Sequence, residues 1–100
     1  MSHATPTKFE LGQQVATPEA LRVFHQAGES LLRYLGRHLA GDWGDLGEED
    51  RRLNDAALLD GSRLFSAYTL RTGVTVWVIT DAVGEDGKRA STCVLLPDEY

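Results

Sequence analysis

The fold of this chain is decided by the stretch VTVWVIT at residues 74–80. It is the most apolar segment of the sequence, and it is rich in the β-branched and aromatic residues that favour strands. Strand geometry places its valines on one face and Trp77 and Ile79 on the other. Because both faces are apolar, the segment is typical of a central strand that is covered on both sides.

Two further strands are expected around this one. The first is residues 63–70, and Arg71–Gly73 between the two fits a three-residue hairpin loop with glycine in the left-handed conformation. The second is residues 91–96, which Pro97 ends because proline cannot donate a hydrogen bond to the ladder. Asp81–Ala90 predicts a longer, exposed loop. The three strands should form an antiparallel meander.

Helices are expected before the strands. Thr17–Glu19 combines a capping hydroxyl, a proline at the first helical position and an acid near the positive end of the helix dipole. The helix that begins there should end at Gly28. Ser30 is expected to cap a second helix, which Gly41 ends.

A third helix is expected from Leu46–Glu48 to Gly61. Helical periodicity places its apolar residues on one side. They are Leu46, Leu53, Ala56 and Ala57.

The order of helices followed by strands predicts one α+β domain at residues 9–100, with the N-terminal helices packed on the three-stranded antiparallel meander. Phe9–Val15 alternates weakly and could add an N-terminal edge strand. Residues 1–8 have the composition of a flexible tail. A length of 100 residues leaves room for a single domain.

Composition excludes several classes of protein. The sequence has no run of 18 apolar residues and no secretory leader, so we expect a cytoplasmic protein without a membrane partner. Cys93 is the single cysteine, which leaves no disulfide framework and no thiolate metal cluster. A net charge of −5 disfavours direct binding to nucleic acid, because such binding needs clustered lysine and arginine.

The whole net charge lies in Asp42–Asp60, where seven acids face only Arg51 and Arg52. These acids could form a surface for a basic partner, or they could simply be a solvated helix face that the dipole explains. Trp43 could pack in the core or anchor an interface. The candidate contact residues in this segment are Asp42, Trp43, Asp45, Glu48, Glu49 and Asp50.

Catalytic and metal-binding motifs are not found. The acidic segment fails the EF-hand pattern, and its glycines match neither the P-loop nor the dinucleotide fingerprint. His25 and His38 lack further ligands at recognised spacing, so both are interpreted as structural. The sequence therefore predicts a protein that is not an enzyme and needs no cofactor or metal. A small hydrolase using Asp42 and Asp45 is the least favoured alternative.

A second candidate contact is the sheet itself. If the helices cover only one face, the other exposes an apolar patch of a kind that marks a partner or a dimer contact. Trp77 is the central candidate, together with Phe65, Ile79 and Leu95.

Several blocks of the sequence also carry a family resemblance. They are Phe9–Pro18, Gly41–Leu46 with Glu49 and Asp50, Leu64–Tyr68, Val76–Thr80 and Leu95–Tyr100. Over these blocks, which span nearly the whole chain, it resembles a family of small bacterial plasmid-related proteins that occur on plasmids and integrative elements. The chain differs chiefly in Asp81–Ala90, where similar proteins have a shorter turn.

Members of that family often carry the label of type I restriction enzyme M subunit. Such a methyltransferase needs a cofactor-binding βαβ core, which this sequence does not supply. The resemblance therefore implies an accessory or anti-defence role on a mobile element. The leading hypothesis is a non-catalytic interaction module with a protein partner or a second copy as a homodimer. The alternative is a restriction-modification or nucleic-acid-processing accessory that binds nucleic acid directly.

Overall fold

The computed structural model describes residues 7–100 and shows an α+β fold, which confirms the predicted class. Residues 1–6 of the predicted tail lie outside the described residues. Lys8 does not belong to a loose tail, because its backbone N–H donates to Leu39 O at 2.9 Å. The strands are β1 (Gln13–Ala16), β2 (Leu64–Thr69), β3 (Thr75–Thr80) and β4 (Ser91–Leu95). The helices are α1 (Pro18–Ala27), α2 (Leu31–Leu39), α3 (Glu48–Asp60) and a short 3₁₀ turn η1 (Pro97–Glu99).

The four strands form one mixed sheet in the order β1-β4-β3-β2. The meander β2-β3-β4 is antiparallel as predicted, but β1 pairs with β4 in parallel, so the sheet is larger than the three-stranded meander. A parallel neighbour needs a long crossover, and here the three helices and two strands between β1 and β4 supply it.

The expected N-terminal edge strand is present but shorter, because the chain turns at Gly12 before pairing begins. Gly12 has φ of +64°, and a Cβ there would lie 2.3 Å from the carbonyl oxygen of Arg89. Only glycine can bring the backbone this close in the left-handed conformation. The N–H of Gln13 then donates to Ala90 O at 2.9 Å and starts the pairing.

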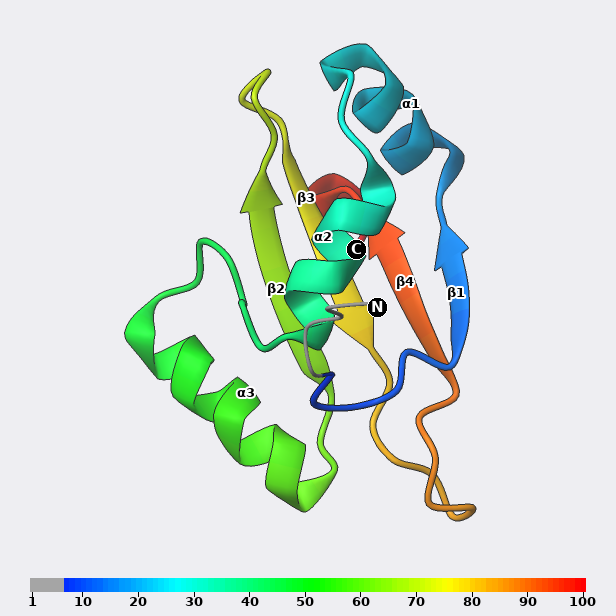
Figure 1. The fold of residues 1–100 in the computed structure, drawn as a ribbon, viewed down its shortest axis with the longest axis vertical. Coiled ribbons are helices and arrows are strands. Elements are labelled where there is room, and N and C mark those ends of the chain that lie inside the picture. The colour runs from blue at the N-terminus through cyan, green and yellow to red at the C-terminus, as the bar shows by residue number, and fades with distance from the viewer. Residues whose placement is uncertain (1–6) are drawn as a thin grey trace, which may run out of the picture.

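Helix α2 lies across one face of the sheet, and α1 lies at the end of the sheet toward which β1 and β4 point (Figure 1). The predicted ends of α1 are confirmed: Thr17 Oγ1 accepts from the N–H of Ala20 at 3.1 Å, and Gly28 closes the helix with φ of +65°. These helices bury an apolar core against β2, β3 and β4. Its buried members include Val23, Phe24, Leu35, Tyr68, Val76, Val78 and Val94.

Helix α3 has the predicted bounds but lies beside β2 and not across a face (Figure 1). The predicted buried side is therefore wrong in part, since Leu53 is 63% exposed whereas Asn54 and Ala57 are buried. The Asn54 amide explains which side of α3 is buried, because it donates to Phe65 O at 2.6 Å and accepts from Phe65 N–H at 3.0 Å. A polar side chain thus satisfies both backbone groups of Phe65 on the outer edge of β2.

The segment 81–90 is exposed as expected except for Arg89, which is buried. The Arg89 guanidinium donates to three backbone carbonyls, those of Ala57, Ser62 and Asp81. One of them, Ala57 O, lies in the last turn of α3, where a cation also suits the helix dipole. None of the helices in residues 7–100 has the length and apolar character needed to span a lipid bilayer.

Candidate functional site

The acidic turn at residues 42–45 is tied to its own neighbours. Asp42 Oδ2 accepts from Arg37 Nε at 2.7 Å, and its Oδ1 accepts from the N–H of Gly44 at 3.1 Å. The hydrogen bond from Arg37 holds the pKa of Asp42 below its usual value. Asp45 Oδ2 accepts from the Thr69 hydroxyl at 2.8 Å. These bonds engage two carboxylates that the sequence offered as partner contacts.

Trp43 is a buried residue, 4% exposed, and so does not present a contact to a partner. Its Nε1–H donates to Asp55 Oδ1 at 3.1 Å, and its ring lies 6.3 Å from that of Phe9 between centroids. Of the two roles expected for Trp43, core packing and interface anchor, the structure shows core packing. Its place among the contact residues is corrected accordingly, because a buried indole with a satisfied N–H stabilises the turn from inside.

The remaining acidic candidates, Glu48, Glu49 and Asp50, form the exposed first turn of α3. Glu48 Oε1 accepts from Arg52 at 2.9 Å, four residues along the helix. Acids at this position are stabilised by the helix dipole without any partner. Within residues 7–100, no group of three or more histidine, cysteine or acidic side chains is arranged to hold a metal ion.

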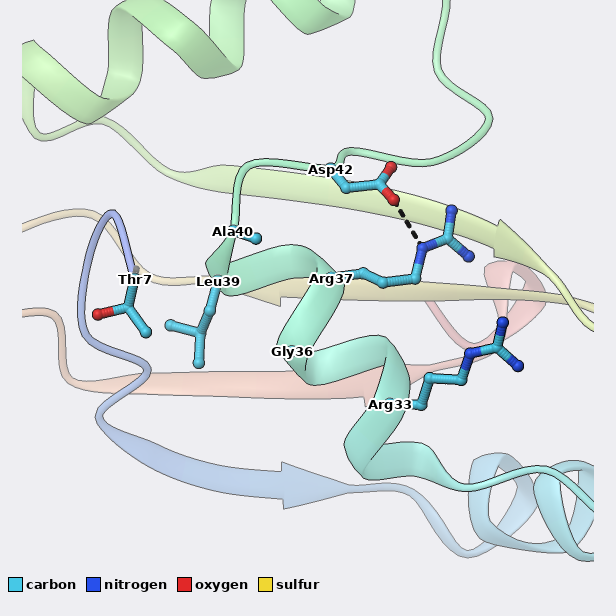
Figure 2. Close-up of a pocket in the computed structure, with 7 residues that line it drawn as sticks. All are labelled: Thr7, Arg33, Gly36, Arg37, Leu39, Ala40 and Asp42. Carbon is cyan, nitrogen blue, oxygen red and sulfur yellow. Dashed lines mark hydrogen bonds and ion pairs between the residues drawn. The ribbon is translucent and has the colours of Figure 1, made fainter. Parts of the chain in front are cut away.

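A hollow of about 450 Å³ lies along α2 and includes Arg33, Arg37 and Asp42 among its lining residues. Figure 2 shows the Arg37 side chain directed toward Asp42 and the Arg33 side chain extending from the same helix. Arg37 and Asp42 in this lining form an ion pair with each other. Asp42 is the acid among the lining residues of the hollow, and it is already paired with Arg37.

A chain of hydrogen bonds runs through the covered side of the sheet from the buried His38. Its Nε2 lies 2.9 Å from Thr80 Oγ1, which lies 2.7 Å from Thr92 Oγ1, and Thr92 donates to Leu11 O at 2.8 Å. Because the end of the chain is a carbonyl acceptor, each hydroxyl must donate toward it. His38 Nε2 is therefore protonated and donates to Thr80.

The other ring nitrogen, His38 Nδ1, lies 2.5 Å from Ser66 Oγ and, when the ring is neutral, accepts a hydrogen bond from the serine hydroxyl. Both residues have no exposed surface, so this serine-histidine pair is not accessible to a substrate. Burial, with a smaller contribution from the charge of Arg89, lowers the pKa of His38 to about 4. The prediction that His38 is structural agrees with this geometry, whereas His25 lies exposed on α1.

The sheet face opposite α1 and α2 is here called the open face and is defined by Phe65, Trp77, Ile79 and Cys93. All four side chains are half-buried. Trp77 lies between two aromatic rings, with centroids 5.0 Å from Phe65 and 5.7 Å from Tyr100. Leu95, which was predicted to be exposed here, is buried instead, and η1 contacts the adjacent strand β3.

One residue at the open face, Tyr100, was missed by the sequence analysis as a contact candidate. Tyr100 is 67% exposed beside Trp77, and Arg63 donates to its hydroxyl at 2.5 Å with the guanidinium over the ring. Together with Phe65, Trp77 and Ile79 they line a hollow of about 200 Å³. A turn signal at Pro97 was visible in the sequence, but nothing there indicated that the turn folds Tyr100 over β3.

Comparison with protein-family models, with curated proteins and with solved structures finds no match to this chain.

Proposed function

We propose that this chain is a non-catalytic protein-interaction module, and that the open face is its contact with a different protein. The observation that carries the proposal is the uneven covering of the sheet. Two helices bury one face, whereas the other keeps the partly exposed Phe65, Trp77 and Tyr100 around a small hollow. Apolar surface of this kind on a small domain is typical of a binding site.

The residues at the hollow have the chemistry of an interface. Tryptophan, tyrosine and arginine are the residue types that carry most binding energy where proteins meet, and Trp77, Tyr100 and Arg63 lie together here. The hollow of about 200 Å³ is smaller than the 300–1,000 Å³ typical of sites for small molecules. An apolar side chain of a protein partner suits it better than a metabolite does.

The acidic turn supports the proposal by elimination. Asp42 and Asp45 are hydrogen-bonded within the chain and Trp43 is buried, so the turn offers less to a partner than the open face does. The resemblance to plasmid-related proteins supports the biological setting of the proposal. Under this proposal, the chain acts in the bacterial cytoplasm as an accessory of a mobile element. Its binding to a host protein would serve an anti-defence role.

The test is capture from host lysate with the tagged chain, after nuclease treatment, followed by measurement of affinity with the purified partner. Ile79→Lys places a charge on the open face and should weaken binding at least tenfold. Leu59→Lys is the matched control, because Leu59 is 93% exposed on α3, and it should bind as the wild type does. Circular dichroism checks that both variants are folded.

Equal binding by the wild type and Ile79→Lys would overturn the open face as the contact. If Asp45→Lys alone abolished binding, the contact would lie at the acidic turn instead. Loss of capture after nuclease treatment, together with salt-dependent binding of purified nucleic acid, would favour the nucleic-acid accessory over this proposal.

A further inference from the structure

The two edges of the sheet are treated differently by the chain. At the β2 edge, Ala67 N–H donates to Trp43 O at 3.2 Å and Asp45 N–H donates to Ala67 O at 2.7 Å. The Asn54 amide bonds both backbone groups of Phe65 on the same edge. Backbone groups of β2 are thus used by the segment at Trp43–Asp45 and by α3, which closes this edge to another strand.

The β1 edge has no such cover among residues 7–100, since β1 is the last strand of the sheet on that side. The N–H groups of Gln13 and Thr17 donate toward β4, to Ala90 O at 2.9 Å and Val94 O at 3.0 Å. Alternation along a strand then directs the backbone groups of Gln14 and Ala16 away from β4. The outer edge of β1 therefore carries two N–H and two C=O groups that a further strand can use.

Two of the devices that usually protect an exposed edge, a charged side chain and a proline, are missing from β1, although the strand is short. Its four residues, Gln13–Ala16, include no charge and no proline, and the first three are exposed. Natural proteins normally place lysine, proline or a bulge at such a position to prevent pairing. From the uncovered edge and its uncharged sequence we propose that β1 pairs antiparallel with β1 of a second copy, joining two sheets into one of eight strands.

The register of this pairing follows from the outward groups. A two-fold axis at Val15 sets Gln14 opposite Ala16 of the second copy, and the reverse, which gives four backbone hydrogen bonds. Val15 meets its own symmetry mate at the axis as a non-hydrogen-bonded pair, in which side chains are closest. The Val15 side chain is 42% exposed in the single chain and becomes covered on pairing.

Charge makes the β1 edge a better place for a second copy than the β2 edge. The segment Asp42–Asp60 carries the whole net charge of −5, and α3 holds most of it beside β2. Figure 1 shows α3 and β1 at opposite edges of the sheet. Pairing through β1 therefore keeps the two acidic segments on the outer sides of the dimer, and more distant charges are better screened.

The dimer is independent of the contact proposed for the open face. A two-fold axis perpendicular to the sheet leaves both open faces on the same side, and neither covers the other. Loss of the dimer therefore leaves the partner contact intact, and loss of the partner contact leaves the dimer intact. The Val15 and Ile79 variants separate the two proposals.

Sedimentation equilibrium over a concentration series tests the pairing. The wild type should approach twice the chain mass of 11.0 kDa as concentration rises. Val15→Lys brings two like charges together at the axis and should weaken dimerisation at least tenfold. Val83→Lys is the matched control, because Val83 is 41% exposed outside β1, and it should dimerise as the wild type does.

A charge exchange sharpens the test. Val15→Lys mixed with Val15→Glu should form a heterodimer, because opposite charges then meet at the axis, while each variant alone stays monomeric. A monomeric wild type up to about 1 mM would overturn the proposal. A dimer that Val15→Lys leaves unchanged would overturn it as well, by placing the contact elsewhere. If β1 instead pairs with a strand of a different protein, the purified chain alone should be monomeric, and that result would overturn the proposal.

Discussion

The two faces of β3 differ although they belong to one strand. Val76, Val78 and Thr80 have no exposed surface, whereas their neighbours Trp77 and Ile79 remain half-buried. Both sets of residues are largely apolar, so composition does not explain the difference. The cause is the placement of the helices, because α1 and α2 pack on one face and α3 lies beside β2 (Figure 1). The apolar sequence of β3 thus indicates that both of its faces favour burial. The packing of the helices determines which face the chain buries itself.

The largest effect expected from this comparison comes from a matched pair of substitutions. Phe24 is 3% exposed under the covered face, and Phe24→Ala should reduce the free energy of unfolding by about 3–5 kcal/mol. Phe65 is half-buried on the open face, and Phe65→Ala should cost only about 1–2 kcal/mol, because less apolar area is lost. Urea denaturation of both variants measures the difference. Equal losses would mean that the open face is already a full core.

The next effect depends on pH and belongs to the covered face alone. His38 is neutral in the fold, with its pKa lowered to about 4 by burial, and an unfolded histidine titrates near its ordinary value of 6.5. Below pH 6.5 the unfolded chain binds a proton that the folded chain does not accept until about pH 4. Stability should therefore fall by about 3 kcal/mol as the pH drops through this interval.

The control for the pH effect is His38→Gln, which removes the titrating ring. Its stability curve should lack this loss between pH 6.5 and 4, although the variant starts from a lower stability at neutral pH because hydrogen bonds to Ser66 and Thr80 are disturbed. Equal slopes for the two proteins, measured by urea denaturation at several pH values, would show that His38 is not a buried neutral group.

The smallest effect is expected at the edge of the open face. Tyr100→Ala removes one aromatic contact with Trp77 and the cation–π contact with Arg63, which should cost about 0.5–1 kcal/mol. Acrylamide quenching of Trp77 should increase, while that of the buried Trp43 should not. Trp43→Phe and Trp77→Phe variants separate the two signals. Unchanged quenching of Trp77 would show that Tyr100 does not cover it.

The features that could be predicted from the sequence are those with local signals. Both ends of α1 follow from Thr17 and Gly28, and the β2–β3 hairpin follows from the alternation on either side of Gly73. The parallel pairing of β1 could not be predicted, because its partner β4 lies near the other end of the chain and no local pattern connects them.

The candidate site was predicted only in part, for a similar reason. Trp77 lies on the open face, as the alternation along the strand indicated. The burial of Trp43 depends on contacts with Phe9 and Asp55, which come together only in the folded chain. The buried side of α3 was assigned by hydrophobic periodicity, whereas hydrogen bonding of Asn54 to the β2 edge determines it. Long-range polar contacts of this kind leave little trace in a single sequence.

The central claim, that a different protein covers the open face, is tested most directly by site-specific photo-crosslinking in host cells. A photoreactive residue replaces Ile79 on the open face or, as the control, the exposed Leu59 on α3. The account predicts a discrete adduct with another protein from position 79 and none from position 59. No adduct from position 79, the same adducts from both positions, or an adduct of only twice the chain mass from position 79 would contradict it.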